Sequence, residues 1–236
     1  MIIKRLAVGI KNQDWFVVTV EIMIVVIGIF IGLQVDDWNQ SRKENVQSEL
    51  FLKQLNMDIE SELLSIKGAI GVHEAHITNG KLAVRFLEGE DIFNEYQVKI
   101  ESALELIHHI PKPQFMHGNM NSLMLGEGWV AIKDQAIIVK LKSLMGRLGN
   151  AIGIYNNIED KIDEITTQNR YLIGFSIAKD NVIKLSYDVD KLQKSANFKI
   201  ALHNTVVLHW YAMRQLNRMV SILEEYKTEQ LSKPHN

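Results

Sequence analysis

Glu21 is the side chain whose position most strongly suggests chemistry, because it is the only ionisable group in a long apolar stretch. Residues 15–35 read WFVVTVEIMIVVIGIFIGLQV. At ~1.5 Å rise per residue, a helix of this length covers ~32 Å, about the thickness of a bilayer's hydrocarbon core. An acid inside the bilayer costs up to about 3 kcal/mol, which the surrounding Val, Ile, Leu and Phe outweigh. The sequence therefore predicts a transmembrane helix that carries an acid.

Glu21 shares one face of this predicted helix with two glycines. On a helical wheel it aligns with Val25, Gly28, Gly32 and Val35. The spacing Gly28-x-x-x-Gly32 allows two helix backbones to approach closely. One interpretation therefore places Glu21, protonated or paired, in a helix–helix contact. The other interpretation treats it as a tolerated acid that is partly hydrated near the membrane interface.

Three histidines form the second candidate site. His73 and His209 both fall in the apolar three- and four-residue periodicity of long predicted helices. If those two helices pair, the imidazoles would meet and form a proton-sensitive or metal-binding site, with His76 on the adjoining face. The alternative is that each of these residues is a hydrogen-bonded core histidine.

Other polar groups are expected to be exposed and without function. His108, His109 and His117 form a further histidine group next to a proline-containing segment. The carboxylate pairs Glu159-Asp160 and Asp163-Glu164 have the spacing of a solvated helix face.

The sequence also contains none of the common catalytic motifs. HExxH, GxSxG, P-loop and GxGxxG patterns are absent, and there is no cysteine to form a disulfide, a thiolate metal site or a nucleophile. A net charge of −2 provides no basic surface for nucleic acid. We therefore expect a protein without catalytic activity, cofactor or nucleic-acid partner.

The elements that must position these residues are long helices. Apolar periodicity predicts helices over residues 52–87, 141–172 and 202–223, and a shorter one over 93–109. Three glycines predict a bend or break in the first of these helices, and Asp134 is placed to cap the second. Residues 111–129 are expected to form a loop, and residues 179–191 a connector or short strand. The predicted fold is mainly α, with one transmembrane helix continuing into an extracytoplasmic antiparallel helical bundle.

The flanks of the apolar stretch predict its orientation. Lys4, Arg5 and Lys11 precede it and Arg42 and Lys43 follow it, so the positive-inside rule, together with Asp36 and Asp37 just after the stretch, places the N-terminus in the cytoplasm. No small-residue cleavage site precedes the first of these aspartates, which favours an uncleaved signal anchor. We expect three parts, which are a short cytoplasmic amphipathic tail (1–14), a transmembrane helix (15–35) and an extracytoplasmic helical domain (36–236). In a bacterium, this places the chain in the inner membrane with a periplasmic domain.

The anchor resembles the N-terminal signature of a family of uncharacterised bacterial single-pass membrane proteins. Residues 21–39 read EIMIVVIGIFIGLQVDDWN, and in that family an acid precedes an IVVIGI-type run that ends in LQ-x-x-x-W-N. Residues 126–138, GEGWVAIKDQAII, are similar to a second patch of the same family. Members usually carry Ala at the position of Gly32 and Asn at those of Asp36 and Asp37. The resemblance implies the topology and the helical character, and it implies no activity.

These observations lead to two hypotheses for function. The first is a membrane-anchored helical protein that self-associates through its transmembrane helix and has a sensing or scaffolding role. The alternative is a single-span subunit of an ion-coupled membrane complex in which Glu21 carries a proton or cation, and which requires another membrane protein as partner. In both, the lipid bilayer is a partner.

Overall fold

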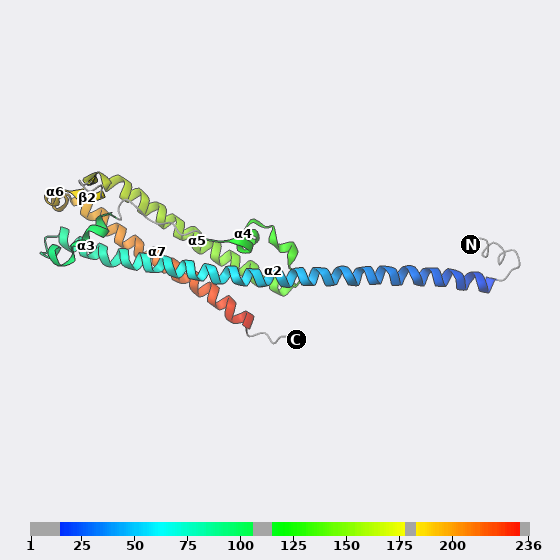
Figure 1. Ribbon diagram of the computed structural model, residues 1–236. Coiled ribbons are helices and arrows are strands. Elements are labelled where there is room, and N and C mark those ends of the chain that lie inside the picture. The colour runs from blue at the N-terminus through cyan, green and yellow to red at the C-terminus, as the bar shows by residue number, and fades with distance from the viewer. Residues whose placement is uncertain (1–14, 106–114, 178–182, 232–236) are drawn as a thin grey trace. The chain divides into compact units, whose positions relative to one another are not determined.

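The computed structural model of the chain describes residues 15–105, 115–177 and 183–231 (Figure 1). The chain divides into two compact units, Met1–Leu52 and Lys53–Asn236. Helix α2, Trp15–Leu87, contributes residues to both units. The expected tail over residues 1–14 lies outside the described residues, as do His108 and His109.

The first unit contains the apolar part of α2. Among the described residues, α2 is the one helix that is long and apolar enough to cross a membrane. Only 6% of its most apolar window is buried within the chain, whereas the core helix of a soluble protein would be mostly buried. Large side chains such as Ile24 and Phe30 are exposed. A Cβ added at Gly28 or Gly32 would meet no atom within 4 Å.

The second unit is a helical body, which confirms a mainly α fold. Its long helices are the later part of α2, α5 (Gln135–Asn169) and α7 (Ala196–Leu231). Helix α7 runs antiparallel to both of the others (Figure 1). The ion pairs between these helices follow that direction: Lys67–Glu224 and Lys227–Glu60 join α2 to α7, and Lys140–Glu229 and Arg147–Glu225 join α5 to α7.

Short elements close one end of this body. They are α3 (Phe93–Glu105), the 3₁₀ turn η2 (Arg170–Leu172), strands β1 (Ile173–Ile177) and β2 (Ile183–Tyr187), and α6 (Val189–Lys194). The two strands form an antiparallel hairpin in which Phe175 pairs with Leu185. Apolar side chains from α2, α3, β1, α6 and α7 form one buried core here, which includes Leu87, Leu104, Ile173, Leu192 and Phe198.

Two boundaries follow from local sequence as expected. Helix α2 ends at Leu87, and Gly89 takes a left-handed conformation with φ of 100° that suits glycine. Helix α5 begins at Gln135, where the Asp134 carboxylate accepts hydrogen bonds from the backbone N–H groups of Ala136 and Ile137 at 2.7 and 3.3 Å.

The expected break within α2 is wrong, because the helix continues through all of its glycines. Gly80 has a packing role that accounts for its presence. It is buried, and a Cβ at this position would collide with the Val206 side chain of α7. Glycine at this position therefore permits the close approach of α2 and α7.

The loop expected over residues 111–129 is also wrong in part. Its described portion contains α4 (Gly118–Leu125) and the 3₁₀ turn η1 (Gly128–Ala131). The start of α4 is held by α2, because the Asp58 carboxylate accepts the backbone N–H of Asn119 at 2.7 Å. This carboxylate lies 61 residues earlier in the sequence, so local turn propensity could not reveal it. The N-terminal end of a helix favours such a negative charge.

Candidate functional site

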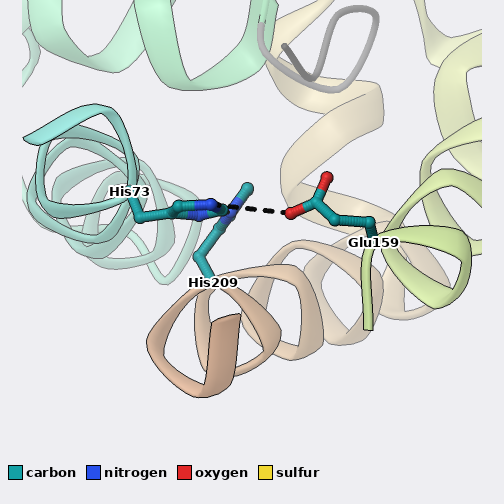
Figure 2. Close-up of side chains that lie close together, drawn as sticks. All are labelled: His73, Glu159 and His209. Atoms are coloured by element: carbon teal, nitrogen blue, oxygen red, sulfur yellow. Dashed lines mark hydrogen bonds and ion pairs between the residues drawn. The ribbon is translucent and has the colours of Figure 1, made fainter. Parts of the chain in front are cut away.

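A cluster of polar side chains lies buried between the three long helices of the second unit. Helix α2 contributes His73 and His76, α5 contributes Tyr155 and Glu159, and α7 contributes His209. Figure 2 shows that His73, Glu159 and His209 point toward one another from three different helices. We call these five residues the histidine–glutamate cluster.

The cluster is linked by short contacts between ring nitrogens and oxygens. His73 Nδ1 lies 2.9 Å from His209 Nδ1, and His209 Nε2 lies 3.2 Å from His76 Nδ1. On the other side, His73 Nε2 lies 3.0 Å from the Tyr155 hydroxyl and 3.6 Å from Glu159 Oε1. The contacts therefore form a continuous chain from Glu159 and Tyr155 through two imidazoles to His76.

Burial determines the charge state of the imidazoles. His73 and His209 are each 3% exposed, and His76 is 6% exposed. Loss of solvation lowers the pKa of His76 to about 4. The same desolvation, together with repulsion from His76, lowers the pKa of His73 to about 4. Desolvation and both other imidazoles lower the pKa of His209 to about 2. The three rings are therefore neutral at neutral pH.

Neutral rings restrict the tautomers of the cluster. Each neutral imidazole has one N–H donor and one acceptor nitrogen. Because the Nδ1 atoms of His73 and His209 face each other, one of them donates the hydrogen bond and the other accepts it. The buried Tyr155 hydroxyl has its pKa raised by desolvation and by the adjacent Glu159 carboxylate, so it remains protonated and able to donate.

The sequence placed part of this cluster correctly. The structure brings His73, His76 and His209 together, as the pairing of their helices would require. The expectation that Glu159 lies on a solvated face is wrong, because Glu159 is 1% exposed. Its neighbours Asp160, Asp163 and Glu164 are exposed, as expected.

The spacing of residues in the sequence indicates that Glu159 is buried, although its charge suggests an exposed position. The buried positions of α5 recur at three- and four-residue steps, and Glu159 follows Tyr155 by four and precedes Ile162 by three. Choosing only apolar residues selects Ile158 instead, although Ile158 is less buried than Glu159. Tyr155 belongs to the apolar periodicity of the helix predicted over residues 141–172, which indicates a buried position but no role in the site.

His117 lies at a separate contact near the start of α4. Its Nδ1 lies 3.3 Å from Glu62 Oε2, which also accepts the backbone N–H of Met116 at 3.2 Å. Desolvation raises the pKa of Glu62, and these hydrogen bonds oppose the rise. His117 is half exposed, and the contact fastens the segment before α4 to α2.

Glu21 and its glycine face belong to the first unit. Glu21 is half-buried, and Val25 and Val35 are exposed. The roles expected for Glu21 and for its helix face stay predictions. If this part of α2 crosses a membrane, the face formed by Val25, Gly28, Gly32 and Val35 contacts lipid or another chain.

The space next to the cluster is small. A cavity of about 10 Å³ borders His76 and His209 and is lined also by Gly80, Thr205 and Val206. This volume is about that of one water or one small ion, and it is far below the several hundred Å³ of an organic ligand site.

Comparisons with known proteins give no relative, since no family model, no curated protein and no solved structure matches the chain. The site's own chemistry is therefore the guide to its role. Two imidazoles and a carboxylate from three helices can exchange protons or bind a metal ion.

Proposed function

We propose that this chain is a membrane-anchored helical protein with a sensing role and without catalytic activity. The apolar part of α2 holds it in the bacterial inner membrane, with the N-terminus in the cytoplasm and the helical body in the periplasm. Two or more copies associate through the transmembrane face that carries Glu21. The length and exposure of the apolar window and the basic residues before it support this arrangement.

The observation that carries the sensing role is the burial of the histidine–glutamate cluster. Placing imidazoles, a phenol and a carboxylate in a core costs solvation that their mutual contacts only partly return. Apolar side chains of similar volume would fill the same space with equal or greater stability. A core that contains these polar groups is therefore better suited to responding to a proton or a ligand than to stabilising the fold.

The position of the cluster also supports this role. It contacts α2, α5 and α7 at once, so a change in its protonation or occupancy alters the packing of all three helices. His73 lies on α2, the helix that also carries the apolar window. A scaffolding role would require only the ion pairs and the apolar core.

Replacing the whole cluster by apolar residues tests the sensing role. The variant combines His73→Leu, His76→Leu, Tyr155→Phe, Glu159→Leu and His209→Leu in the full chain, measured in detergent with EDTA. We expect an unfolding free energy equal to or above that of the wild type, because no polar group remains buried without a partner. Urea titration followed by circular dichroism measures this quantity.

A single replacement provides the matched control. His209→Ala leaves the partners on α2 unsatisfied and opens a cavity, so it should destabilise the protein by about 3 kcal/mol. If the fivefold variant is destabilised as strongly as this control, the cluster stabilises the fold and the sensing role is rejected in favour of a scaffold.

A further inference from the structure

The ligand chemistry of the cluster leads beyond a general sensing role. His73, Glu159 and His209 each offer one ligand atom, and these atoms all lie within 4.8 Å of one another (Figure 2). All three side chains are buried, and each comes from a different helix. Helical bundles commonly build metal sites in this way, from inward-facing Glu and His residues on neighbouring helices.

We propose that His73, Glu159 and His209 form a binding site for a divalent transition metal of the Zn²⁺ type. This inference rests on the proposed function, because it names the ligand to which the cluster responds. Two imidazoles and one carboxylate are a set of protein ligands that Zn²⁺ accepts in tetrahedral sites, with water in the fourth position.

The distances are compatible with such an ion after small movements. Zn²⁺ lies ~2.0–2.2 Å from nitrogen and oxygen ligands, so ligand atoms at the corners of a tetrahedral site are about 3.3 Å apart. His73 Nε2 and Glu159 Oε1 are 3.6 Å apart, and the Nδ1 atoms of His73 and His209 are 2.9 Å apart. One nitrogen of the His73 ring faces Glu159 and the other faces His209, so this ring must turn to bring a single nitrogen together with the other two donors around one ion.

His76 and Tyr155 act as positioning residues in this proposal. His76 Nδ1 contacts His209 Nε2 at 3.2 Å, which orients the other nitrogen of that ring toward His73. A hydrogen bond to the distal ring nitrogen commonly fixes the tautomer and orientation of a metal-binding histidine. On the opposite side, the Tyr155 hydroxyl contacts His73 Nε2 and interacts with the Glu159 carboxylate, so it links these two ligands.

The nature of the donors determines which metals should bind. Imidazole nitrogen suits Zn²⁺ and its neighbours in the first transition row. Mg²⁺ requires oxygen ligands and keeps much of its hydration shell, so it should not compete. Mg²⁺ is therefore the control ion.

Metal binding is measured on the full-length protein in detergent, carrying a tag without histidines and freed of metal with EDTA before dialysis. Calorimetric titration with Zn²⁺ should give one ion per chain, and Mg²⁺ should give no heat of binding. Glu159→Gln and His209→Gln should each weaken Zn²⁺ binding by about 100-fold or more, since each removes one ligand. His76→Gln should weaken it by about 10–100-fold, as expected for a partner of a ligand.

Two exposed residues on the same helices provide matched controls. His203→Gln on α7 and Asp160→Asn on α5 remove surface groups and should leave Zn²⁺ affinity unchanged. Zn²⁺ at 100 times its dissociation constant should raise the Tm of the wild type by about 5–10 °C and should not raise that of the fivefold apolar variant.

Failure of binding and failure of the sensing role are distinguishable. A folded wild-type protein that binds no Zn²⁺, or that binds it equally well with Glu159→Gln and His209→Gln, overturns the metal site. The stability of the fivefold variant is measured in EDTA, so that experiment tests the sensing role independently of metal binding. An unchanged affinity in His76→Gln overturns the positioning role of His76.

Discussion

The Nδ1 atoms of His73 and His209 lie 2.9 Å apart, although the two residues are separated by 136 positions in the sequence. This contact joins α2 to α7 in the interior of the helical body. Because both rings are buried, only one of the facing nitrogens carries a proton when the site is empty. Binding of an ion to either of these nitrogens would break that shared hydrogen bond, because the lone pair of a metal-binding nitrogen is used in the metal bond and the nitrogen carries no proton. The proposed site therefore has a defined empty state as well as a filled one.

The topology can be tested by labelling, because the chain has no natural cysteine. We expect Asn204→Cys, at an exposed position of α7, to react with a membrane-impermeant maleimide once the outer membrane is permeabilised. Lys11→Cys, before the apolar stretch, should react only after the cells are lysed. The reverse pattern of labelling would show that the helical body lies in the cytoplasm.

Self-association of the transmembrane segment should depend on its two glycines. Gly28→Leu and Gly32→Leu each add a side chain where two backbones are expected to approach, so each should weaken association in a two-hybrid assay in membranes. Ile27→Leu, on another face of the helix, is the matched control and should have no effect. Equal signals from all three variants would show that the glycine face is not the contact.

Glu21 distinguishes the two functional hypotheses. As a hydrogen-bonding group between helices, it can be replaced by Gln with the oligomer retained, whereas Glu21→Ala should loosen the oligomer by about 1 kcal/mol per contact. As an ion carrier, Glu21→Gln should assemble normally and lose ion-coupled activity, while Glu21→Asp keeps part of it. Native mass spectrometry in detergent measures the assembly. Normal assembly and activity in all of these variants would make Glu21 a tolerated interfacial acid.

Two glycines of α2 should respond in opposite ways to the same substitution. Gly80→Ala places a methyl group against the β-branched Val206 side chain and should destabilise the protein by about 1–3 kcal/mol. Gly68→Ala meets no atom within 4 Å and should stabilise the helix by up to about 1 kcal/mol. Urea denaturation of both variants provides the comparison. Stabilisation by Gly80→Ala would contradict the close approach of α2 and α7.

Acid should destabilise the metal-free protein through the cluster. The pKa values of His73 and His76 fall to about 4 in the folded state, below the ordinary value of 6.5, so the unfolded chain binds more protons between these values. Neutral His73 and His76 contribute fully to the free energy of unfolding above pH 6.5, and this contribution is lost as the pH falls toward 4. The loss reaches about 2 kcal/mol per histidine at pH 5. His209 continues this loss to lower pH, because its pKa is about 2.

The fivefold apolar variant isolates this effect from the other titrating groups. It lacks the three imidazoles and the adjacent Tyr155 and Glu159, which are the ionisable groups of α2, α5 and α7 in contact within the cluster. Its unfolding free energy should change less between pH 7 and pH 5 than that of the wild type. Equal changes in the two proteins would assign the acid sensitivity to other groups.

Local sequence was enough to predict the long helices and several of their ends. A stretch of apolar residues as long as residues 15–35 predicts a membrane-crossing helix by composition alone. Regular three- and four-residue spacing revealed α5 and α7, and Asp134 marked the start of α5 because capping depends on neighbours in the chain. The hairpin β1–β2 was predicted only in part, since a short strand is stable only against its partner and the core beneath it.

The sequence by itself determined that histidines occupy buried positions of α2 and α7, because apolar periodicity fixes which face of a helix turns inward. The composition of the site was decided only by the tertiary structure. Glu159 and Ile158 are neighbours in the sequence. Which of them faces the core depends on the rotation of α5 about its own axis, and packing against α2 and α7 fixes that rotation. Packing selects Glu159, because at that rotation its carboxylate reaches Tyr155 and His73, whereas polarity alone suggests a solvated residue. The cluster depends on contacts between residues far apart in the chain, and the spacing of residues along one helix does not specify them.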